Sequence, residues 1–253
     1  MPVVRLEGVT EEITVGTIYC VGRNYKAHVL EMGGDLPTVP VVFMKPSGAV
    51  VTEGEPLRLP AFSRDVHHEV ELVVLIGMEG KDIPRAEAMD YVIGYGVGLD
   101  LTARDLQNEA KSQGLPWTIC KGFDGSAPLS RFVRAAGVGD PQGLELTLRV
   151  NETVRQHSGT GLMIFSVAEL IAYLSTIFTL RSGDLIYTGT PEGVGPLHPG
   201  DRLELTLGSA VADAAAPAQA VKTPVAAPLV GAAPPAAGLL VRARFEVERK
   251  AGS

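Results

Sequence analysis

The sequence has 253 residues, of which 45% are hydrophobic and 20% are charged, so the chain is long enough for a sizeable core. Its formal net charge is −7, which argues against a nucleic-acid partner because phosphate binding needs a concentrated basic surface. No uninterrupted apolar segment reaches about 18 residues, so no membrane span is expected. The N-terminal sequence lacks the features of a signal peptide, and Cys20 and Cys120 lack metal-ligand spacing, so we expect a cytoplasmic protein with reduced, buried thiols.

Short strand-like runs dominate the chain; they are rich in β-branched and aromatic residues and are bounded by Gly, Pro and Asp. Strands are expected at residues 13–22, 39–46, 70–77, 91–100, 144–151, 184–191, 201–208 and 239–248. Helices are expected at residues 24–35, 103–114 and 166–180, the last with a capping box formed by Ser166 and Glu169. Strands outnumber helices without strict alternation, which favours a β-rich α+β fold over a doubly wound α/β sheet.

Residues 67–77, HHEVELVVLIG, have the pattern of a buried strand that carries two carboxylates. Residues two apart in a strand point to the same face, so Glu69 and Glu71 are neighbours, with His67 behind them. The opposite face is apolar and can pack on the core. A buried carboxylate is costly unless a positive group meets it, so the pair indicates a cation site. The alternative is an amphipathic strand with solvated glutamates.

The strand expected at residues 91–100 adds a third carboxylate. Gly94, Gly96 and Gly98 alternate along one face, and Asp100 follows in the same phase. Glycine at these positions permits close approach of a ligand or of another backbone. The alternative is that the glycines relieve crowding in a tightly coiled sheet.

Three carboxylates that face one point carry a charge near −3, which a hard divalent cation would compensate. Mg²⁺ or Mn²⁺ is expected because both prefer oxygen ligands. Zinc is disfavoured, since His67 and His68 lack a helical partner histidine and no cysteine is nearby. Three protein oxygens leave positions of an octahedral ion open, as in a catalytic metal site.

Several motifs occur together in the order VGRNY, HHEVEL, LDLTARDLQ, QGLPWTICKGF, SVAELIAYLS and GDLIYTGTPEGVGPLHPGD. In this combination the sequence resembles the fumarylacetoacetate hydrolase family, in particular its single-domain members of the acylpyruvate hydrolase and oxaloacetate decarboxylase type. The resemblance runs from about Ile18 to about Leu207 and resumes at Leu239. It implies a mixed β-roll and a homodimer, neither of which follows from periodicity.

The resemblance also implies a ligand set. One Mg²⁺ or Mn²⁺ per subunit would be held by Glu69, Glu71 and Asp100, where the spacing of the carboxylates had already pointed. Residues 1–253 would form one catalytic domain, in which residues 1–17 are a lead-in.

The sequence departs from the family pattern at residues 209–238, which are mostly Ala, Pro and Val with almost no charge. Relatives usually join the two flanking strands by a short turn. Prolines break helices and alanines form poor strands, so we expect a long flexible insertion. A partner-docking arm is the alternative.

His28 and Glu31 are three residues apart on one face of the first expected helix. A carboxylate beside an imidazole orients it and raises its basicity, which suits a general base. Two solvated polar residues on a surface helix are the alternative. The resemblance favours the catalytic role, because the family uses such a pair on a lid, and Gly33 and Gly34 behind the helix suit a hinge.

Lys121 lies among apolar and aromatic residues, where a lysine is usually paired, so it could balance the carboxylates and bind an oxyanion as a catalytic residue. A surface lysine is the alternative, and the resemblance favours the catalytic role. Gln107 corresponds to a polar group beside the metal in the family; a solvated helix glutamine is its alternative. Arg23 and Lys45 each follow a strand and could bind the substrate carboxylate. Thr190 offers a hydroxyl in a glycine-containing loop suited to anions.

These residues predict hydrolysis of a C–C bond in an acylpyruvate, such as fumarylpyruvate or acetylpyruvate, giving pyruvate and a carboxylic acid. His28, oriented by Glu31, would activate the water. Oxaloacetate decarboxylation and tautomerisation or isomerisation of a 2-oxo acid pass through the same enolate and need the same residues, so they remain alternatives. A non-catalytic metal-binding module is the alternative from a different class.

Overall fold

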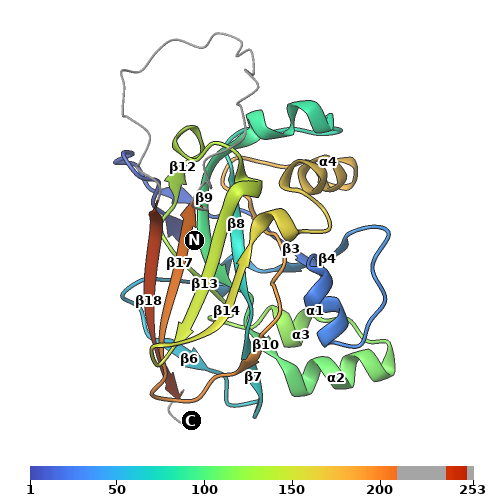
Figure 1. The fold of residues 1–253 in the computed structure, drawn as a ribbon, viewed down its shortest axis with the longest axis vertical. Helices are drawn as coiled ribbons and strands as arrows, with labels where there is room; N and C mark the ends of the chain where they lie inside the picture. The colour runs from blue at the N-terminus through green and yellow to red at the C-terminus, as the bar shows by residue number, and fades with distance from the viewer. Residues whose placement is uncertain (210–237, 250–253) are drawn as a thin grey trace.

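The computed structural model describes residues 1–209 and 238–249 (Figure 1). Its larger sheet contains eight strands, in the order β4-β3-β15-β8-β9-β11-β5 with β12 paired to β9. The pairs β3–β15 and β5–β11 are parallel and the other pairs are antiparallel, so the sheet is mixed. The strands are β3 (Ile18–Gly22), β4 (Val41–Lys45), β5 (Val50–Thr52), β8 (Val70–Ile76), β9 (Val92–Leu99), β11 (Ala127–Leu129), β12 (Val133–Arg134) and β15 (Leu185–Tyr187).

A second sheet has five strands in the order β14-β13-β17-β18-β6. They are β6 (Leu57–Leu59), β13 (Leu144–Val150), β14 (Thr153–Gly159), β17 (Arg202–Ser209) and β18 (Leu239–Arg249). A small sheet in the order β10-β7-β16 lies near the first turn of α2, and a two-stranded ribbon pairs β1 with β2. These strands are β1 (Val3–Val4), β2 (Ile13–Thr14), β7 (Val66–His68), β10 (Thr102–Ala103) and β16 (Gly195–Pro196).

The helices are short and few compared with the strands. They are α1 (Lys26–Glu31), α2 (Arg104–Gln113), α3 (Thr118–Lys121) and α4 (Val167–Ile177). Single 3₁₀ segments occur at Ser47–Ala49, Arg85–Tyr91, Ala135–Gly137, Pro141–Gly143 and Thr160–Leu162. The expected capping box is present, since the Ser166 hydroxyl accepts from the Glu169 amide and the Glu169 carboxylate accepts from the Ser166 amide. α2 ends as expected at Gly114, which has a left-handed backbone with φ of 67°.

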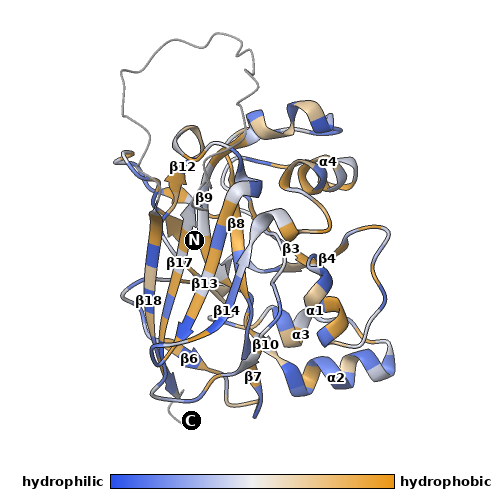
Figure 2. Ribbon diagram, in the orientation of Figure 1, coloured by the Kyte–Doolittle hydropathy of each residue, from blue (hydrophilic) through white to orange (hydrophobic). Residues whose placement is uncertain are grey.

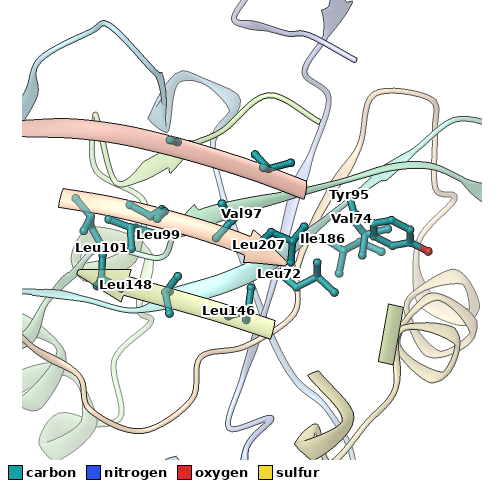
Figure 3. Packing of buried hydrophobic residues seen from close by; sticks show 14 of the residues in the cluster. Leu72, Val74, Tyr95, Val97, Leu99, Leu101, Leu146, Leu148, Ile186 and Leu207 are labelled. Carbon is teal, nitrogen blue, oxygen red and sulfur yellow. The ribbon is translucent and has the colours of Figure 1, made fainter. Parts of the chain in front are cut away.

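The main hydrophobic core lies between the two sheets (Figure 3). Leu72 and Val97 from the larger sheet belong to it together with Leu146 and Leu207 from the smaller one. The other face of β8 is buried in a second cluster, which explains why its sequence is almost continuously apolar. Figure 2 shows hydrophobic colouring on the inner strands and hydrophilic segments along α2.

The glycines of β9 face neighbouring protein groups. A Cβ atom would lie 2.9 Å from the Val133 carbonyl oxygen at Gly94, 3.0 Å from Ser130 Oγ at Gly96 and 2.8 Å from Tyr187 Oη at Gly98. Relief of crowding against β11, β12 and β15 is therefore the correct interpretation, and close approach of a ligand along this face is wrong.

The predicted β-rich α+β fold is confirmed, including the mixed, curved sheet that the resemblance implied. The strand expected at residues 13–22 is divided, because β2 pairs with β1 whereas β3 enters the large sheet. The insertion expected at residues 209–238 lies, apart from its two end residues, outside the described residues. That residues 1–253 form a single domain stays a prediction.

Candidate active site

The stretch with the two glutamates forms two strands that are interrupted at Glu69, where a continuous strand was expected. The main-chain oxygen of Glu69 accepts a hydrogen bond of 2.9 Å from the amide of Asp100. Glu69 is 5% exposed and Glu71 is 1% exposed, so the alternative of solvated glutamates is wrong. His67 lies at the edge of this region, where its Nε2 contacts Asp65 Oδ1 at 2.9 Å.

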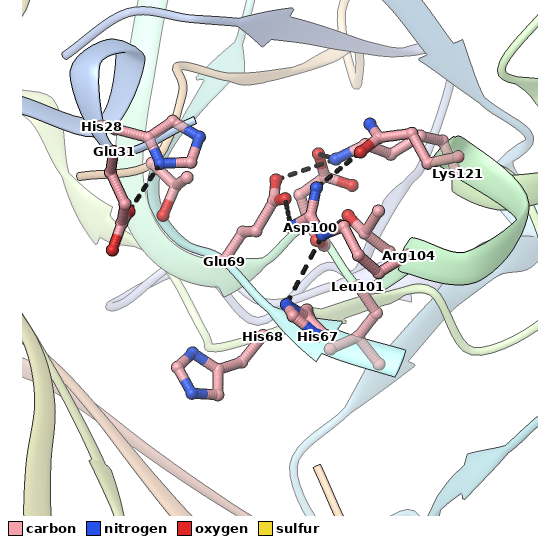
Figure 4. A network of polar contacts seen from close by, with 12 residues as sticks. His28, Glu31, His67, His68, Glu69, Asp100, Leu101, Arg104 and Lys121 are labelled. Carbon is pink, nitrogen blue, oxygen red and sulfur yellow. Dashed lines mark hydrogen bonds and ion pairs between the residues drawn. The ribbon is translucent and has the colours of Figure 1, made fainter. Parts of the chain in front are cut away.

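Pairing of β8 with β9 brings Asp100 to the two glutamates. One carboxylate oxygen from each of Glu69, Glu71 and Asp100 lies within 4.8 Å of the other two, and all three side chains are buried. The predicted convergence of three carboxylates is therefore present in the fold. They line one cavity together with His28, Lys121 and Thr190. Figure 4 shows Glu69, Asp100 and Lys121 in this network, with His28 and Glu31 nearby.

Three basic side chains surround this cluster. Lys121 Nζ donates to Glu69 Oε2 at 2.8 Å and to Asp100 Oδ2 at 2.5 Å. Arg104 donates from Nη2 to Glu69 Oε1, and Lys45 Nζ lies 2.8 Å from Asp100 Oδ1. The expected charge near −3 is thus largely compensated within the protein. Of these three contacts the sequence predicted only that of Lys121.

Glu69 and Glu71 experience opposite electrostatic environments. Burial would raise the pKa of Glu69, but Lys121 and Arg104 outweigh it and hold that pKa below its usual value. Burial raises the pKa of Glu71, and Asp100 and Glu69 raise it further. Its Oε2 accepts one hydrogen bond of 2.7 Å from the Gly189 amide. Within the described residues, no basic side chain forms an ion pair with Glu71.

The residues of this cluster fit a hard divalent cation. The donors are carboxylate oxygens, which Mg²⁺ and Mn²⁺ prefer. Asp100 Oδ1 is buried and, within the described part of the chain, receives no hydrogen bond of acceptable geometry despite the nearby Lys45 ammonium. Among the described residues no basic side chain forms an ion pair with Glu71, so a cation at this point would meet a buried carboxylate that still lacks a positive partner.

The pair of His28 and Glu31 is formed on α1. His28 is 7% exposed, and its Nδ1 lies 3.2 Å from Glu31 Oε2. Because a carboxylate only accepts hydrogen bonds, this contact requires a proton on Nδ1. Glu31 also accepts from the amide of Gly193 at 3.1 Å, which fixes α1 to the loop that contains Thr190. The alternative of two solvated surface residues is therefore wrong for His28.

The expected substrate-binding residues are distributed around the cavity in different ways. Arg23, Gln107 and Thr190 line it. Gln107 accepts from Arg104 Nη1 at 2.5 Å, so it lies beside the carboxylate cluster. Lys45 is 2% exposed and is absent from the cavity lining; its ammonium contacts Asp100 and the Leu101 carbonyl oxygen, at 3.2 Å, behind the cluster.

Two functional positions were missed by the sequence reasoning. Arg104 shares the inner face of α2 with Gln107, and this helical spacing could have identified it. Gln156 is buried on β14; its Oε1 accepts from the Val70 amide at 3.0 Å, and its Nε2 donates to Thr190 Oγ1 at 2.9 Å. It thereby joins the loop that contains Thr190 to the start of β8. No sequence signal pointed to Gln156, because β14 was not predicted.

Comparison with known proteins identifies the family to which this chain belongs. Residues 17–219 match the family described as Fumarylacetoacetate (FAA) hydrolase C-terminal. The chain belongs to the fumarylacetoacetate hydrolase family. The resemblance seen in the sequence is confirmed, and a non-catalytic module is no longer needed to explain the carboxylate cluster.

Relatives within the fumarylacetoacetate hydrolase family have different activities. The chain is 53% identical over 187 residues to the mitochondrial oxaloacetate tautomerase FAHD1 of Mus musculus, which covers 74% of this chain and 85% of that protein. A crystal structure of fumarylpyruvate hydrolase from Pseudomonas aeruginosa in complex with Mn²⁺ and pyruvate has a TM-score of 0.82 and 38% identity. It covers 98% of this chain and 96% of that one.

A further solved relative is a 5-carboxymethyl-2-hydroxymuconate delta-isomerase from Mycobacterium smegmatis. Its TM-score is 0.74 at 35% identity, with coverage of 95% of this chain and 82% of that one. The family thus includes a tautomerase, a hydrolase and an isomerase among the relatives of this chain.

No helix in residues 1–209 and 238–249 is long and apolar enough to cross a membrane.

Proposed function

We propose that this protein interconverts the keto and enol forms of a 2-oxo acid, with oxaloacetate as the preferred substrate, in a reaction that depends on Mg²⁺ or Mn²⁺. The observation that carries the proposal is that a buried imidazole held by a carboxylate shares one cavity with three convergent carboxylates. The sequence alone ranked C–C hydrolysis first. The identity of 53% to an oxaloacetate tautomerase favours tautomerisation instead.

Glu69, Glu71 and Asp100 would hold the cation, one per subunit. A divalent cation supplies Lewis acidity, which favours negative charge on the oxygen of a carbonyl group. Lys121 adds a fixed positive charge at the same end of the cavity, because its ammonium contacts two of the three carboxylates. Lys45 supports the position of Asp100 from behind, so we assign it a positioning role.

His28 would move the proton. Its Nε2 accepts a proton from C3 of the keto acid, and the electron pair of that C–H bond forms the C2–C3 double bond. The carbonyl π electrons move to the 2-oxygen, which becomes the enol hydroxyl after it takes up a proton. Glu31 stabilises the imidazolium that forms in between, since its carboxylate lies beside Nδ1.

The remaining polar groups of the cavity would fix the substrate. Thr190 is held by Gln156 and presents its hydroxyl in a loop that also donates a backbone amide to Glu71. Gln107 and Arg23 add donors at the cavity wall. We propose that these three residues orient the substrate carboxylate and 2-oxo group for proton removal.

Hydrolysis of an acylpyruvate is the second candidate function. It is supported by the solved fumarylpyruvate hydrolase, which covers nearly the whole chain. In that reaction His28 would take a proton from water, the hydroxide would attack the distal carbonyl carbon, and pyruvate would leave as its enolate. Decarboxylation of oxaloacetate yields the same enolate and needs no attacking water.

A homodimer and a cytoplasmic location remain proposals for this chain. The homodimer follows from the family resemblance. The cytoplasmic location follows from the sequence alone, whereas the relative from Mus musculus is named as mitochondrial.

The test is a substrate panel run with Mg²⁺ and with Mn²⁺. Ketonisation of enol oxaloacetate, release of CO₂ and cleavage of fumarylpyruvate and acetylpyruvate are measured on the same preparation. We expect ketonisation to have the highest kcat/KM. Rapid acylpyruvate cleavage without accelerated ketonisation would reject tautomerisation and restore hydrolysis to first place.

A further inference from the structure

Among the residues that the structure describes, two basic side chains of the cavity have no acidic partner. Arg104 and Lys121, which also line it, both contact Glu69. Arg23 and Lys111 line the same cavity, yet within the described residues neither takes part in an ion pair or a side-chain hydrogen bond. The cavity therefore contains positive charge that the carboxylate cluster does not use.

Lys111 lies on the same face of α2 as the residues beside the carboxylates. Arg104, Gln107 and Lys111 are spaced three and four residues apart, so they project to one side of the helix. Lys111 is roughly 10 Å farther along the helix axis than Arg104. Its Nζ lies over the Trp117 ring, 5.5 Å from the ring centroid, and Trp117 also lines the cavity.

Arg23 reaches the cavity from the loop between β3 and α1. Its φ is 62°, a left-handed backbone that is uncommon for a residue other than glycine. Its guanidinium lies against Gly34, where a Cβ atom would be 3.6 Å from Arg23 Cζ. A strained backbone that directs a basic side chain into a cavity is a common feature of ligand sites.

The two cations act on one another. Burial lowers the pKa of Lys111, and the charges of Arg104 and Arg23 lower it further. Like charges that line one cavity repel each other, and an anion bound between them reduces this repulsion. A carboxylate between Lys111 and Arg23 would remove this repulsion and form charge-assisted hydrogen bonds.

We propose that Lys111 and Arg23 bind the distal carboxylate of a dicarboxylic 2-oxo acid whose 2-oxo acid end meets the cluster of Glu69, Glu71 and Asp100. This assignment rests on the proposed function, because it assumes that the 2-oxo acid end is bound at the cluster. The protein then selects diacids over monoacids such as pyruvate. The carboxyl carbons of a four-carbon diacid are about 4 Å apart when extended, and the flexible lysine can adjust to longer diacids.

The proposal is tested by binding, which is independent of turnover. Mn²⁺-loaded protein is titrated calorimetrically with pyruvate and with 3,3-difluorooxaloacetate, a diacid that has no C3 proton and cannot enolise. The variants are Lys111→Met, which keeps an unbranched side chain over Trp117, and Arg23→Asn, since asparagine tolerates a positive φ. Lys81→Met is the matched control, because Lys81 contacts the Thr176 carbonyl oxygen and is absent from the cavity lining.

We expect the wild type and Lys81→Met to bind the diacid more tightly than pyruvate. Lys111→Met and Arg23→Asn should each reduce this preference about tenfold, chiefly by lowering the affinity for the diacid. Retained pyruvate binding shows that a variant is folded. The proposal is overturned if the wild-type protein does not prefer the diacid, or if both variants keep that preference. Failure to ketonise enol oxaloacetate would instead reject the proposed reaction. The ratio of the two affinities can still be measured in that case, so the two failures are distinguishable.

Discussion

The three carboxylates of the cavity do not have equal partners. Glu69 and Asp100 share the ammonium of Lys121, whereas the one hydrogen bond that Glu71 accepts from the described part of the chain comes from the Gly189 amide. An added divalent cation would therefore change the environment of Glu71 most. The basic residues hold the cluster in place before a cation arrives, and the charges of Lys121 and Arg104 lower the pKa of Glu69.

Replacement of His28 by Ala should lower turnover of the enol by about 10²–10⁴-fold, because the group that moves the proton is lost. Mn²⁺ affinity should be unchanged, since His28 is outside the carboxylate cluster. Steady-state ketonisation and Mn²⁺ titration are measured on the same variant. Turnover that survives the substitution would show that another group moves the proton.

Replacement of Lys121 by Met should destabilise the metal-free protein by about 3–5 kcal/mol, because two buried carboxylates lose a shared cation. Urea unfolding in the presence of a chelator measures this free energy. Lys81→Met, which removes an exposed charge, is the control and should change stability by less than about 1 kcal/mol. Equal stabilities for the two variants would contradict the role of Lys121.

Local periodicity was sufficient to predict that Glu69 and Glu71 are neighbours, because a strand places alternate residues on one face. Asp100 joins them through the pairing of β8 with β9, which periodicity alone does not encode. Arg104 and Gln156 depend on which elements meet in space. Gln156 contacts Val70 and Thr190 only because β14 lies beside the start of β8. Periodicity within one segment does not indicate that β14 and β8 are neighbours in the fold.

At the scale of elements, the start of α4 is determined by local sequence, whereas the glycines of β9 are required by packing against other strands. The capping box at Ser166 predicted the start of α4, since it is a contact between residues three apart. The glycines of β9 were also visible in the sequence. Their purpose was not, because the groups that crowd them belong to β11, β12 and β15.

The capping box should give a pH-dependent contribution to stability. Hydrogen bonds from the Ser166 hydroxyl and amide lower the pKa of Glu169 below its ordinary value of 4.5. The carboxylate is therefore stabilised in the folded state above the unfolded pKa, and this contribution is lost as the pH falls through the folded pKa. Glu169→Ala should cost about 1 kcal/mol at about pH 7 and clearly less at about pH 3.

Urea unfolding at the two pH values measures this difference. Glu87→Ala is the control, because Glu87 is exposed in a 3₁₀ segment and, within the described chain, has no side-chain hydrogen bond. A cost for Glu169→Ala that is the same at both pH values would contradict the ionised cap.

Gly98→Ala should destabilise the protein by about 1–3 kcal/mol, because the added methyl group would lie 2.8 Å from Tyr187 Oη and 2.9 Å from the Pro128 carbonyl oxygen. Gly48→Ala is the matched control, since a Cβ atom there meets nothing within 4 Å. Thermal unfolding compares the two variants. Similar unfolding midpoints for the two variants would show that β11 and β15 can move to accommodate the methyl group without loss of stability.

At the scale of the whole molecule, two sheets enclose the main core (Figure 1). The cavity that contains Glu69, Glu71 and Asp100 is lined by residues of α1, α2 and α3 and lies at the start of β8. Strand-rich α+β composition was predictable from the pattern of apolar residues. The mixed strand order was predictable only through resemblance to known relatives, because periodicity does not encode which strands pair.

The most direct test of the central claim is the rate of enol oxaloacetate ketonisation before and after removal of divalent ions. The cluster of Glu69, Glu71 and Asp100 predicts that thorough chelation abolishes the enzyme-catalysed rate and that Mn²⁺ or Mg²⁺ restores it in wild type but not in Glu71→Gln. An undiminished rate in chelated protein, or full recovery in Glu71→Gln, would contradict the claim.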